Sequence, residues 1–272
     1  MMTSSDPRLT LLLPQYKTLE LTRLCLRIIR KNLDLNEVRV IVIDNDSRDE
    51  SLEYLRTVPW ITLIERTAIP GEKPAEAHTR ALDMGLAVTD TEFVMSMHTD
   101  TFFLGNGAMD LLLDPFKDPA VAGTGSWKLE YVSPLKRFGK WLENLFRNYI
   151  KAPLTGKAPG SATRVHKEHW FLRRHCAVYR TKLLKEMQLS FGDGETAGKA
   201  IHRKLETAGY KMLFLPSEVL MEHLLHLDHA TMILNPETGG RKTAKPAARR
   251  QLQKALEKMH YRDIQDAPRE DC

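Results

Sequence analysis

Apolar and polar positions alternate regularly through the first hundred residues. Four short apolar runs predict buried strands, at residues 8–13, 38–43, 60–65 and 93–97. Three intervening stretches with apolar residues at helical spacing predict helices, at residues 19–32, 51–58 and 74–86. This alternation is typical of a parallel sheet with crossover helices. We therefore expect a Rossmann-like α/β fold with a mostly parallel central sheet and flanking helices.

Polar residues follow the predicted strands at their carboxyl ends. Gln15 and Tyr16 follow the first strand, a turn cluster at 44–49 follows the second, and the tripeptide HTD at 98–100 follows the fourth. Ligands of open α/β sheets bind beyond the carboxyl ends of the strands. We therefore expect a ligand site at this edge of the sheet.

The second half of the chain has a less regular pattern. It predicts strands at residues 120–123, 126–132, 170–179 and 211–215, and helices at residues 134–150, 196–208 and 247–260. Residues 151–169 are rich in Pro, Gly, Lys and His and predict a long mobile loop. We expect one domain over residues 1–234, followed by a basic C-terminal linker and helix over residues 235–272.

The predicted helix at 134–150 has an apolar face and basic flanks, and its apolar residues include Trp141, Leu142, Phe146 and Tyr149. Such a face favours packing on the sheet. The alternative is contact with a membrane surface, which would suit a lipid-linked acceptor. The basic helix at 247–260 is favoured as a solvated helix, with a membrane or oligomer contact as the alternatives.

Composition and charge narrow the class of protein. The chain of 272 residues is 42% hydrophobic and 28% charged, which is enough apolar material for one large core. No apolar run is long enough to span a membrane, no secretory signal is evident, and the three cysteines are scattered. We therefore expect a cytoplasmic protein, with peripheral contact at the inner membrane face as an addition. The net charge of +5 suits a nucleotide diphosphate, and without a DNA- or RNA-binding motif we expect no nucleic-acid partner.

Four sequence elements then point to one family. They are LTLLLPQY at 9–16, VIVIDNDSRDES at 40–51, AEAHTRALDMGLAVTDTEFVMSMHTD at 75–100 and AGYKMLFLPSEVLMEH at 208–223. In this order they resemble the family-2 glycosyltransferases of the GT-A fold. The resemblance implies transfer of a sugar, of hexosyl type, from a UDP- or GDP-sugar to a hydroxyl of a saccharide or lipid-linked acceptor. It also implies inversion, a divalent metal ion (Mn²⁺ or Mg²⁺), and a role in cell-surface polysaccharide or glycoconjugate synthesis.

The resemblance implies roles for individual residues as well. It assigns nucleotide binding to residues at the strand ends and on the third helix: Pro14, Tyr16, Asp44, Asn45, His78 and His98. Asp100 matches the last carboxylate of the family's Asp-x-Asp motif, a metal ligand, and His98 replaces the first carboxylate. In that place His98 can ligate manganese, hydrogen-bond a hydroxyl, or simply end a strand. His223 matches the family's late histidine, which completes the metal site. His226 and His229 are then structural, and a zinc site made of all three histidines is the alternative.

An inverting transfer also needs a general base for the acceptor hydroxyl. The family takes this base from an acidic pair ahead of the helix that ends in Gly-Tyr. Here the pair is split by a glycine, as Asp193 and Glu195, and either can be the catalytic base, with Asp193 slightly favoured. The alternative is that both carboxylates only stabilise the start of the helix near Thr196.

Basic and aromatic residues around the predicted loop have two interpretations each. A basic set can close over a diphosphate or a charged acceptor, or can be solvated: Arg164, His166, Lys167, Arg173 and Arg174. Trp127 and Trp170 can stack on a sugar ring or pack in the core. Sequence alone leaves these alternatives open.

Two other functions compete with glycosyl transfer. A sugar-phosphate nucleotidyltransferase would use a similar sheet, but its first loop is usually rich in glycine, and residues 14–18 (PQYKT) contain none. A non-catalytic nucleotide-sugar-binding protein on the same fold is favoured by His98 in place of a carboxylate and by the split acidic pair. Pyrophosphate release would indicate the first, and binding without turnover would indicate the second.

Overall fold

A computed structural model describes most of the first half of the chain and two later segments. The residues described are 6–127, 129, 142, 143, 145, 146, 149, 170–194, 196–227, 230, 250, 257, 263, 264, 267, 271 and 272. The predicted mobile loop at 151–169 lies outside them, as do Glu195, His229 and most of the predicted elements at 126–132, 134–150 and 247–260.

Nine strands are described, and their bounds follow the predicted apolar runs closely in the first half. They are β1 (Leu9–Gln15), β2 (Val38–Asp44), β3 (Thr62–Glu65), β4 (Phe93–Ser96), β5 (Thr101–Phe103), β6 (Val121–Gly125), β7 (Ala177–Arg180), β8 (Lys211–Phe214) and β9 (Leu224–His226). Three of them differ from expectation. β7 starts seven residues later than predicted, and β5 and β9 were not predicted, because three-residue strands leave no periodic signal.

The described helices cover both faces of the sheet. They are α1 (Leu19–Asn32), α2 (Glu50–Thr57), α3 (Pro74–Val88), α4 (Gly107–Leu113), the 3₁₀ turn η1 (Asp114–Lys117), α8 (Thr181–Glu186), α9 (Lys199–Thr207) and α10 (Ser217–Leu220). The start of α9 corrects a prediction. Gly198, with φ +79°, is its N-cap, so the helix begins three residues after the predicted position at Thr196.

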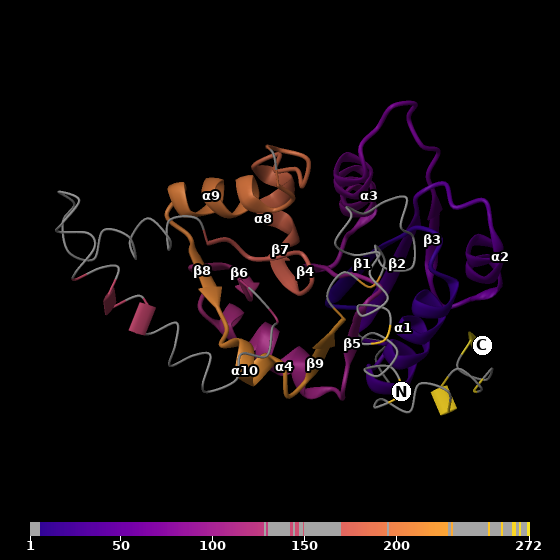
Figure 1. The fold of residues 1–272 in the computed structure, drawn as a ribbon. Helices are drawn as coiled ribbons and strands as arrows, with labels where there is room; N and C mark the ends of the chain where they lie inside the picture. Colours follow the sequence, from indigo (N-terminus) through magenta and orange to yellow (C-terminus); the bar gives the residue numbers. More distant parts are fainter. Residues whose placement is uncertain are drawn as a thin grey trace.

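The central sheet has seven strands in the order β3-β2-β1-β4-β7-β6-β8. The pairs β3–β2, β2–β1, β1–β4 and β6–β8 are parallel, which confirms the mostly parallel sheet. Only β7 runs antiparallel to its two neighbours, β4 and β6. A second sheet pairs β5 with β9 antiparallel, below the main sheet in the view of Figure 1.

Side chains alternate along the strands of the central sheet between two apolar cores. Leu11 and Leu13 of β1 pack in the core beneath α1, whereas Leu12 packs in the core beneath α3. Figure 1 shows the resulting layers, with α3, α8 and α9 on one side of the sheet and α1, α4 and α10 on the other. Helix α3 approaches most closely at Gly85, where an added Cβ would lie 2.8 Å from the Leu12 side chain. The fold is therefore a three-layer α/β arrangement, as predicted.

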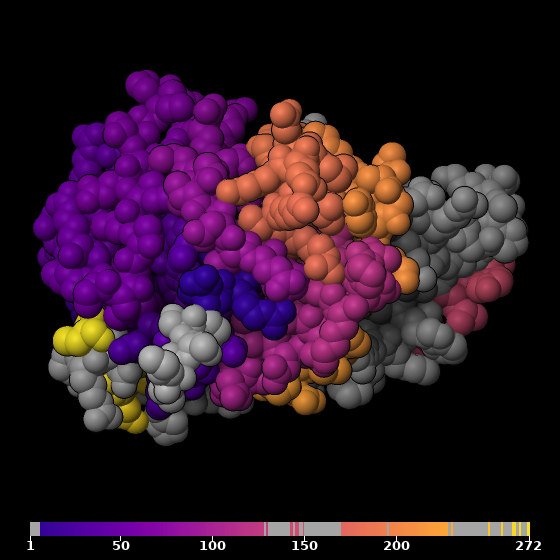
Figure 2. Space-filling view, turned by 180° about the vertical axis from the view of Figure 1, so that it is seen from behind, coloured from indigo at the N-terminus to yellow at the C-terminus, as the bar shows by residue number. Residues whose placement is uncertain are grey.

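Segments distant in sequence are close in this fold. In the space-filling view the orange segment with α8 and α9 lies directly against the purple-to-magenta first half (Figure 2). The C-terminus also returns to the N-terminal half: the Asp271 carboxylate pairs with Arg27 of α1 and accepts a 2.7 Å hydrogen bond from Tyr54 of α2. Whether residues 235–272 form a separate unit stays a prediction.

The apolar face of the predicted helix at 134–150 differs from expectation. Packing on the sheet would bury it, yet all four of its described apolar side chains are exposed, by 41–67%: Leu142, Leu145, Phe146 and Tyr149. Among the residues that the structure describes, no helix is both long enough and apolar enough to cross a membrane.

Candidate functional site

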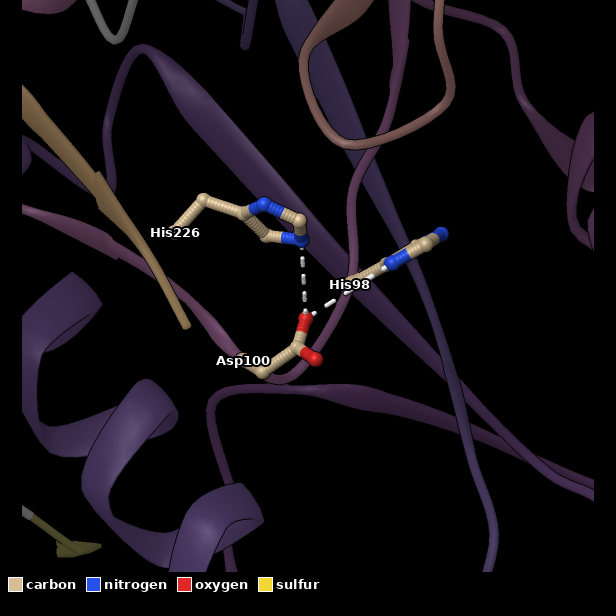
Figure 3. Close-up of side chains that lie close together, drawn as sticks. All are labelled: His98, Asp100 and His226. Carbon is tan, nitrogen blue, oxygen red and sulfur yellow. Dashed lines mark ion pairs between the residues drawn. The ribbon is translucent and has the colours of Figure 1, made fainter. Parts of the chain in front are cut away.

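Three side chains from two parts of the chain meet beside the carboxyl end of β4. His98 and Asp100 follow β4, and His226 ends β9. Pairing of β5 with β9 sets Thr101 opposite His226, and the Leu227 N–H bonds to the Asp100 carbonyl at 2.8 Å. The possible ligand atoms of the three side chains lie within 4.8 Å of one another (Figure 3). This group, His98, Asp100 and His226, is called the triad below.

Asp100 is the electrostatic centre of the triad. Its Oδ1 lies 3.5 Å from His226 Nε2 and 3.6 Å from His98 Nδ1, and both dashed lines in Figure 3 meet at this oxygen. These contacts are too long for good hydrogen bonds, and Oδ1 is buried without a hydrogen-bond partner. Burial raises the pKa of Asp100, but the two imidazoles outweigh burial and hold the pKa well below its usual value. Asp100 is therefore a carboxylate with an unused, buried acceptor oxygen.

Arg174 determines the tautomer of His98. Its Nε donates a 3.1 Å hydrogen bond to His98 Nε2, and a guanidinium N–H can only donate. His98 Nε2 must therefore accept, so a neutral ring carries its proton on Nδ1, facing Asp100. Burial lowers the pKa of His98 and favours this neutral form. His98 thus presents an N–H to Asp100 and no lone pair, which makes Asp100 and His226 the better candidates to hold a metal ion.

Two more histidines extend this cluster on either side. His78 of α3 stands edge-on to His98, with ring centroids 5.1 Å apart, and its buried Nε2 has no hydrogen-bond partner. His175 stacks on His226 at 5.1 Å, and its Nε2 is 2.9 Å from Ser126 Oγ. Burial lowers the pKa of both His78 and His175 well below the usual value. Both rings are therefore neutral at physiological pH.

The predicted metal ligand His223 lies apart from the triad. His223 directly precedes β9, three residues before His226, and its carbonyl accepts a 2.8 Å hydrogen bond from the Leu104 N–H. Its ring packs against Gly107 at the start of α4, where an added Cβ would lie 2.9 Å from His223 Nδ1. Among the described residues, the group whose possible ligand atoms lie within 4.8 Å of one another contains His226 and not His223. The geometry favours His226 for the role that the sequence assigned to His223.

The other predicted nucleotide-binding residues lie along the same sheet edge. Strand register pairs Gln15 with Asp44, so Pro14, Asp44 and Asn45 end adjacent strands. Asp44 is 1% exposed and accepts hydrogen bonds from the Gln15 side chain and from the Ser47 N–H, at 2.9 Å. Its carboxylate thus ties the two strand ends together, and a contact with the nucleotide stays a prediction.

Asn45 and Tyr16 also have partners inside the chain. Arg66 Nη1 donates a 3.2 Å hydrogen bond to Asn45 Oδ1. The half-buried ring of Tyr16 has the Lys17 ammonium 5.1 Å from its centroid. The nucleotide-binding roles of Asn45, Tyr16 and Pro14 stay predictions.

The candidate base Asp193 lies on a loop held by α3. Asp83 of α3 accepts hydrogen bonds from Ser190 Oγ at 2.6 Å and from the Phe191 N–H at 2.7 Å. Asp193 itself pairs with Lys204 of α9 at 2.5 Å. It contacts the flank of α9, not its N-terminus, so helix capping does not explain it. Glu195, the other candidate base, lies outside the described residues.

Sequence reasoning missed two contributors to this site. The sequence resemblance gives His226 a structural role. It leaves Arg174 among basic residues that either bind an anion or are solvated. The place of His226 beside Asp100 follows from the pairing of β9 with β5. It cannot be recognised before that pairing is known. No local sequence signal distinguishes Arg174 from its neighbour Arg173.

Known proteins resemble this chain in structure, at low sequence identity. No protein-family model matches the chain, and a search of curated proteins finds no match. The mannosyltransferase PcManGT from Pyrobaculum calidifontis, in complex with GDP-Man and Mn²⁺, matches with a TM-score of 0.56 and 17% identity, over 97% of this chain and 74% of that one. S. aureus TarS matches with a TM-score of 0.49 and 14% identity, over 85% of this chain and 63% of its own.

A third solved structure is glucosyl-3-phosphoglycerate synthase from Mycobacterium tuberculosis in complex with phosphoglyceric acid. It matches with a TM-score of 0.45 and 16% identity, over 74% of this chain and 65% of its own. The chain thus spans somewhat less than two thirds of the TarS and synthase chains. From the PcManGT match and the sheet topology, the chain has the fold of the GT-A-type glycosyltransferases.

Proposed function

We propose that this protein is a nucleotide-sugar-dependent glycosyltransferase whose donor site lies at the triad. The observation that carries the proposal is the buried, unpartnered Oδ1 of Asp100 beside His226, at the edge where α/β sheets bind ligands. The similarity to a mannosyltransferase that binds GDP-Man and Mn²⁺ supports it. We infer a UDP- or GDP-sugar as donor, a saccharide or lipid-linked acceptor, and hexosyl transfer with inversion.

The residues present fit a divalent metal ion. Asp100 and His226 would hold it, since one offers an anionic oxygen without a partner and the other an imidazole nitrogen. Mixed oxygen and nitrogen donors suit Mn²⁺ better than Mg²⁺, which prefers oxygen alone. When bound, such an ion neutralises charge on the diphosphate leaving group.

Other residues of the chain would position the metal ligands, remove the acceptor proton and support this edge of the sheet. Arg174 holds His98 through one hydrogen bond, and this turns the ring proton on Nδ1 toward Asp100. Asp193, on the loop anchored by Asp83, is our candidate to remove the proton from the acceptor hydroxyl, with Glu195 as the other. Asp44 and Gln15 keep the ends of β1 and β2 together, which preserves the edge that receives the nucleotide.

A panel of nucleotide-sugars tests the proposal. We expect donor hydrolysis or transfer with at least one UDP- or GDP-sugar in the presence of Mn²⁺, and loss of this activity in Asp100→Asn with an unchanged melting temperature. Chromatography of the products identifies the reaction. Pyrophosphate release from a nucleoside triphosphate would instead show a nucleotidyltransferase. Nucleotide-sugar binding without turnover would show a non-catalytic protein.

Peripheral membrane contact belongs to the same proposal. The four apolar side chains exposed between 142 and 149 follow helical spacing, and residues 133–169 contain eight Lys and Arg against two Glu. An apolar stripe within a basic segment fits the surface of an anionic membrane.

Vesicle co-sedimentation tests the membrane contact. We expect the protein to sediment with vesicles of anionic phospholipid more than with neutral ones. Phe146→Asp should reduce this binding about tenfold, since it removes buried apolar area. Val88→Asp is a matched control, because Val88 is 54% exposed and Phe146 56%. Equal sedimentation of both variants would contradict the contact.

A further inference from the structure

Arg174 differs from Arg27 and Arg66 because no carboxylate in the part of the chain that the structure describes pairs with it. Among the described residues, its guanidinium makes one hydrogen bond, from Nε to His98 Nε2, and no ion pair. Arg27 pairs with Asp271, and Arg66 pairs with Glu72. Arg174 is half-buried, and a cation partly removed from water is stabilised by an anionic partner, so an arginine with none in the described segments, beside a ligand site, suggests an anionic ligand.

The surroundings of Arg174 have excess positive charge and hydrogen-bond donors. Its neighbour in the chain is Arg173, and Asp100 is the carboxylate that acts on it electrostatically. The His78 ring, with its unpartnered nitrogen, is close enough to sense the charge of Arg174. Asp100 is the carboxylate that acts on Arg174 and on the four histidines of the cluster, and it is already shared within the triad. The region therefore has unused capacity to bind an anion.

The shape of the side chain indicates which anion. The Nε group donates to His98, and within the described part of the chain neither Nη group has a hydrogen-bond partner, so both can donate to a ligand. Two parallel N–H groups match two oxygens of one phosphate, which lysine cannot do. Placed next to the proposed metal ligands, such a fork would contact the same phosphates as the metal.

We propose that Arg174 is a diphosphate-binding residue, whose Nη groups bind the phosphates of the nucleotide donor while its Nε holds His98. This inference rests on the proposed function and adds to it one specific cationic side chain, that of Arg174. A single side chain then has two roles, since it binds the donor and positions His98 beside Asp100. Loss of Arg174 should therefore weaken nucleoside diphosphate binding far more than binding of the nucleoside.

Arg173 provides a matched control one residue away. Its guanidinium lies 4.9 Å from the Trp127 ring and 5.2 Å from the Phe171 ring, so it is engaged with aromatic faces and not with the triad. Arg173→Gln and Arg174→Gln remove the same charge from the same segment. A difference between them therefore reports the position of Arg174 and not the net charge of the protein.

The test is calorimetric titration of UDP, GDP and the two nucleosides in the presence of Mn²⁺. Arg174→Gln should lower nucleoside diphosphate affinity about 10- to 100-fold, the range expected for lost hydrogen bonds to a charged group. Arg174→Lys, which keeps the charge without the fork, should show an intermediate loss. Arg173→Gln should change the affinity less than threefold, and nucleoside affinity should change little in every variant.

Three outcomes would overturn the inference. If wild-type protein binds a nucleoside diphosphate and Arg174→Gln binds it equally well, Arg174 is not the phosphate ligand, and the proposed function stands. If both arginine variants lose affinity equally, the effect is one of general charge. If wild-type protein binds neither UDP nor GDP with Mn²⁺, the proposed function fails together with the inference. Should Arg174→Gln not fold, as judged by its melting temperature, the Lys variant carries the same comparison.

Discussion

His223 and His226 are the two candidates for the histidine ligand of the metal ion. Strand pairing brings His226 to 3.5 Å from Asp100 and turns His223 toward Gly107. We expect His226→Ala to lower Mn²⁺ affinity by at least about tenfold, because it removes one of the two proposed ligands. His223→Ala should leave the affinity unchanged. Calorimetric Mn²⁺ titration of both variants decides the question, and the reverse pattern would restore the assignment made from sequence.

Burial of His202 makes the stability of the folded protein depend on pH. Burial lowers its pKa to about 4, with Arg203 acting in the same direction and Glu206, at 3.4 Å, opposing it. Between this value and the ordinary 6.5, the unfolded chain binds a proton that the folded chain does not. The contribution of neutral His202 to stability is therefore present above pH 6.5 and lost as the pH falls toward 4.

His202→Asn tests this pH dependence. Asparagine keeps an acceptor for the Leu172 N–H, which His202 Nδ1 accepts at 3.3 Å, but it does not titrate. Compared with the variant, the free energy of unfolding of the wild-type protein should fall more steeply on acidification, by up to about 3 kcal/mol over this window. Denaturant titrations at several pH values measure the two slopes. Parallel slopes would show that His202 titrates normally in the folded protein.

At the scale of elements, one side chain of α3 controls the loop before α9. Asp83 accepts three hydrogen bonds from residues 190–192, and the candidate base Asp193 follows directly. Asp83→Ala leaves these donors unsatisfied, so we expect a loss of about 1–3 kcal/mol in stability. Hydrogen exchange of peptides that cover 190–194 should accelerate. Asp90→Ala, which removes an exposed partner of Arg39, should leave that loop unchanged.

At the scale of the whole molecule, the C-terminus is joined to the first two helices. Arg27 is 5% exposed in its side chain and pairs through two nitrogens with Asp271, which also accepts from Tyr54. Removal of one partner from such a pair leaves a buried charge, so Asp271→Ala should cost about 3 kcal/mol of unfolding free energy. Glu186→Ala, in an exposed pair with Lys182, is the control and should have almost no effect.

A double substitution distinguishes this pair from a general effect of the terminus. If Arg27 and Asp271 act as partners, Arg27→Met combined with Asp271→Ala should lose less than the sum of the two single losses. Thermal and denaturant unfolding give the required values. Additive losses would show that the two residues stabilise the protein independently.

Periodicity was sufficient for the first half of the fold. The runs around Leu11, Val40 and Val94 alternate with helical stretches, and each became a strand of the central sheet in the predicted direction. It was insufficient where signals are short or non-local. Antiparallel β7 depends on β4, whose paired residues are 81–87 positions earlier in the chain, and Gly198 moved the start of α9.

The sequence by itself determined the α/β class, the parallel half of the sheet and the edge at which polar groups gather, because these follow from local spacing and from the ends of apolar runs. Only the tertiary structure decided which histidine joins Asp100, and that Arg174 holds His98 while Arg173 lies on aromatic rings. Neighbours in sequence differ in these roles because a strand or turn directs adjacent side chains to opposite sides, and pairing between distant strands selects the side that faces the site.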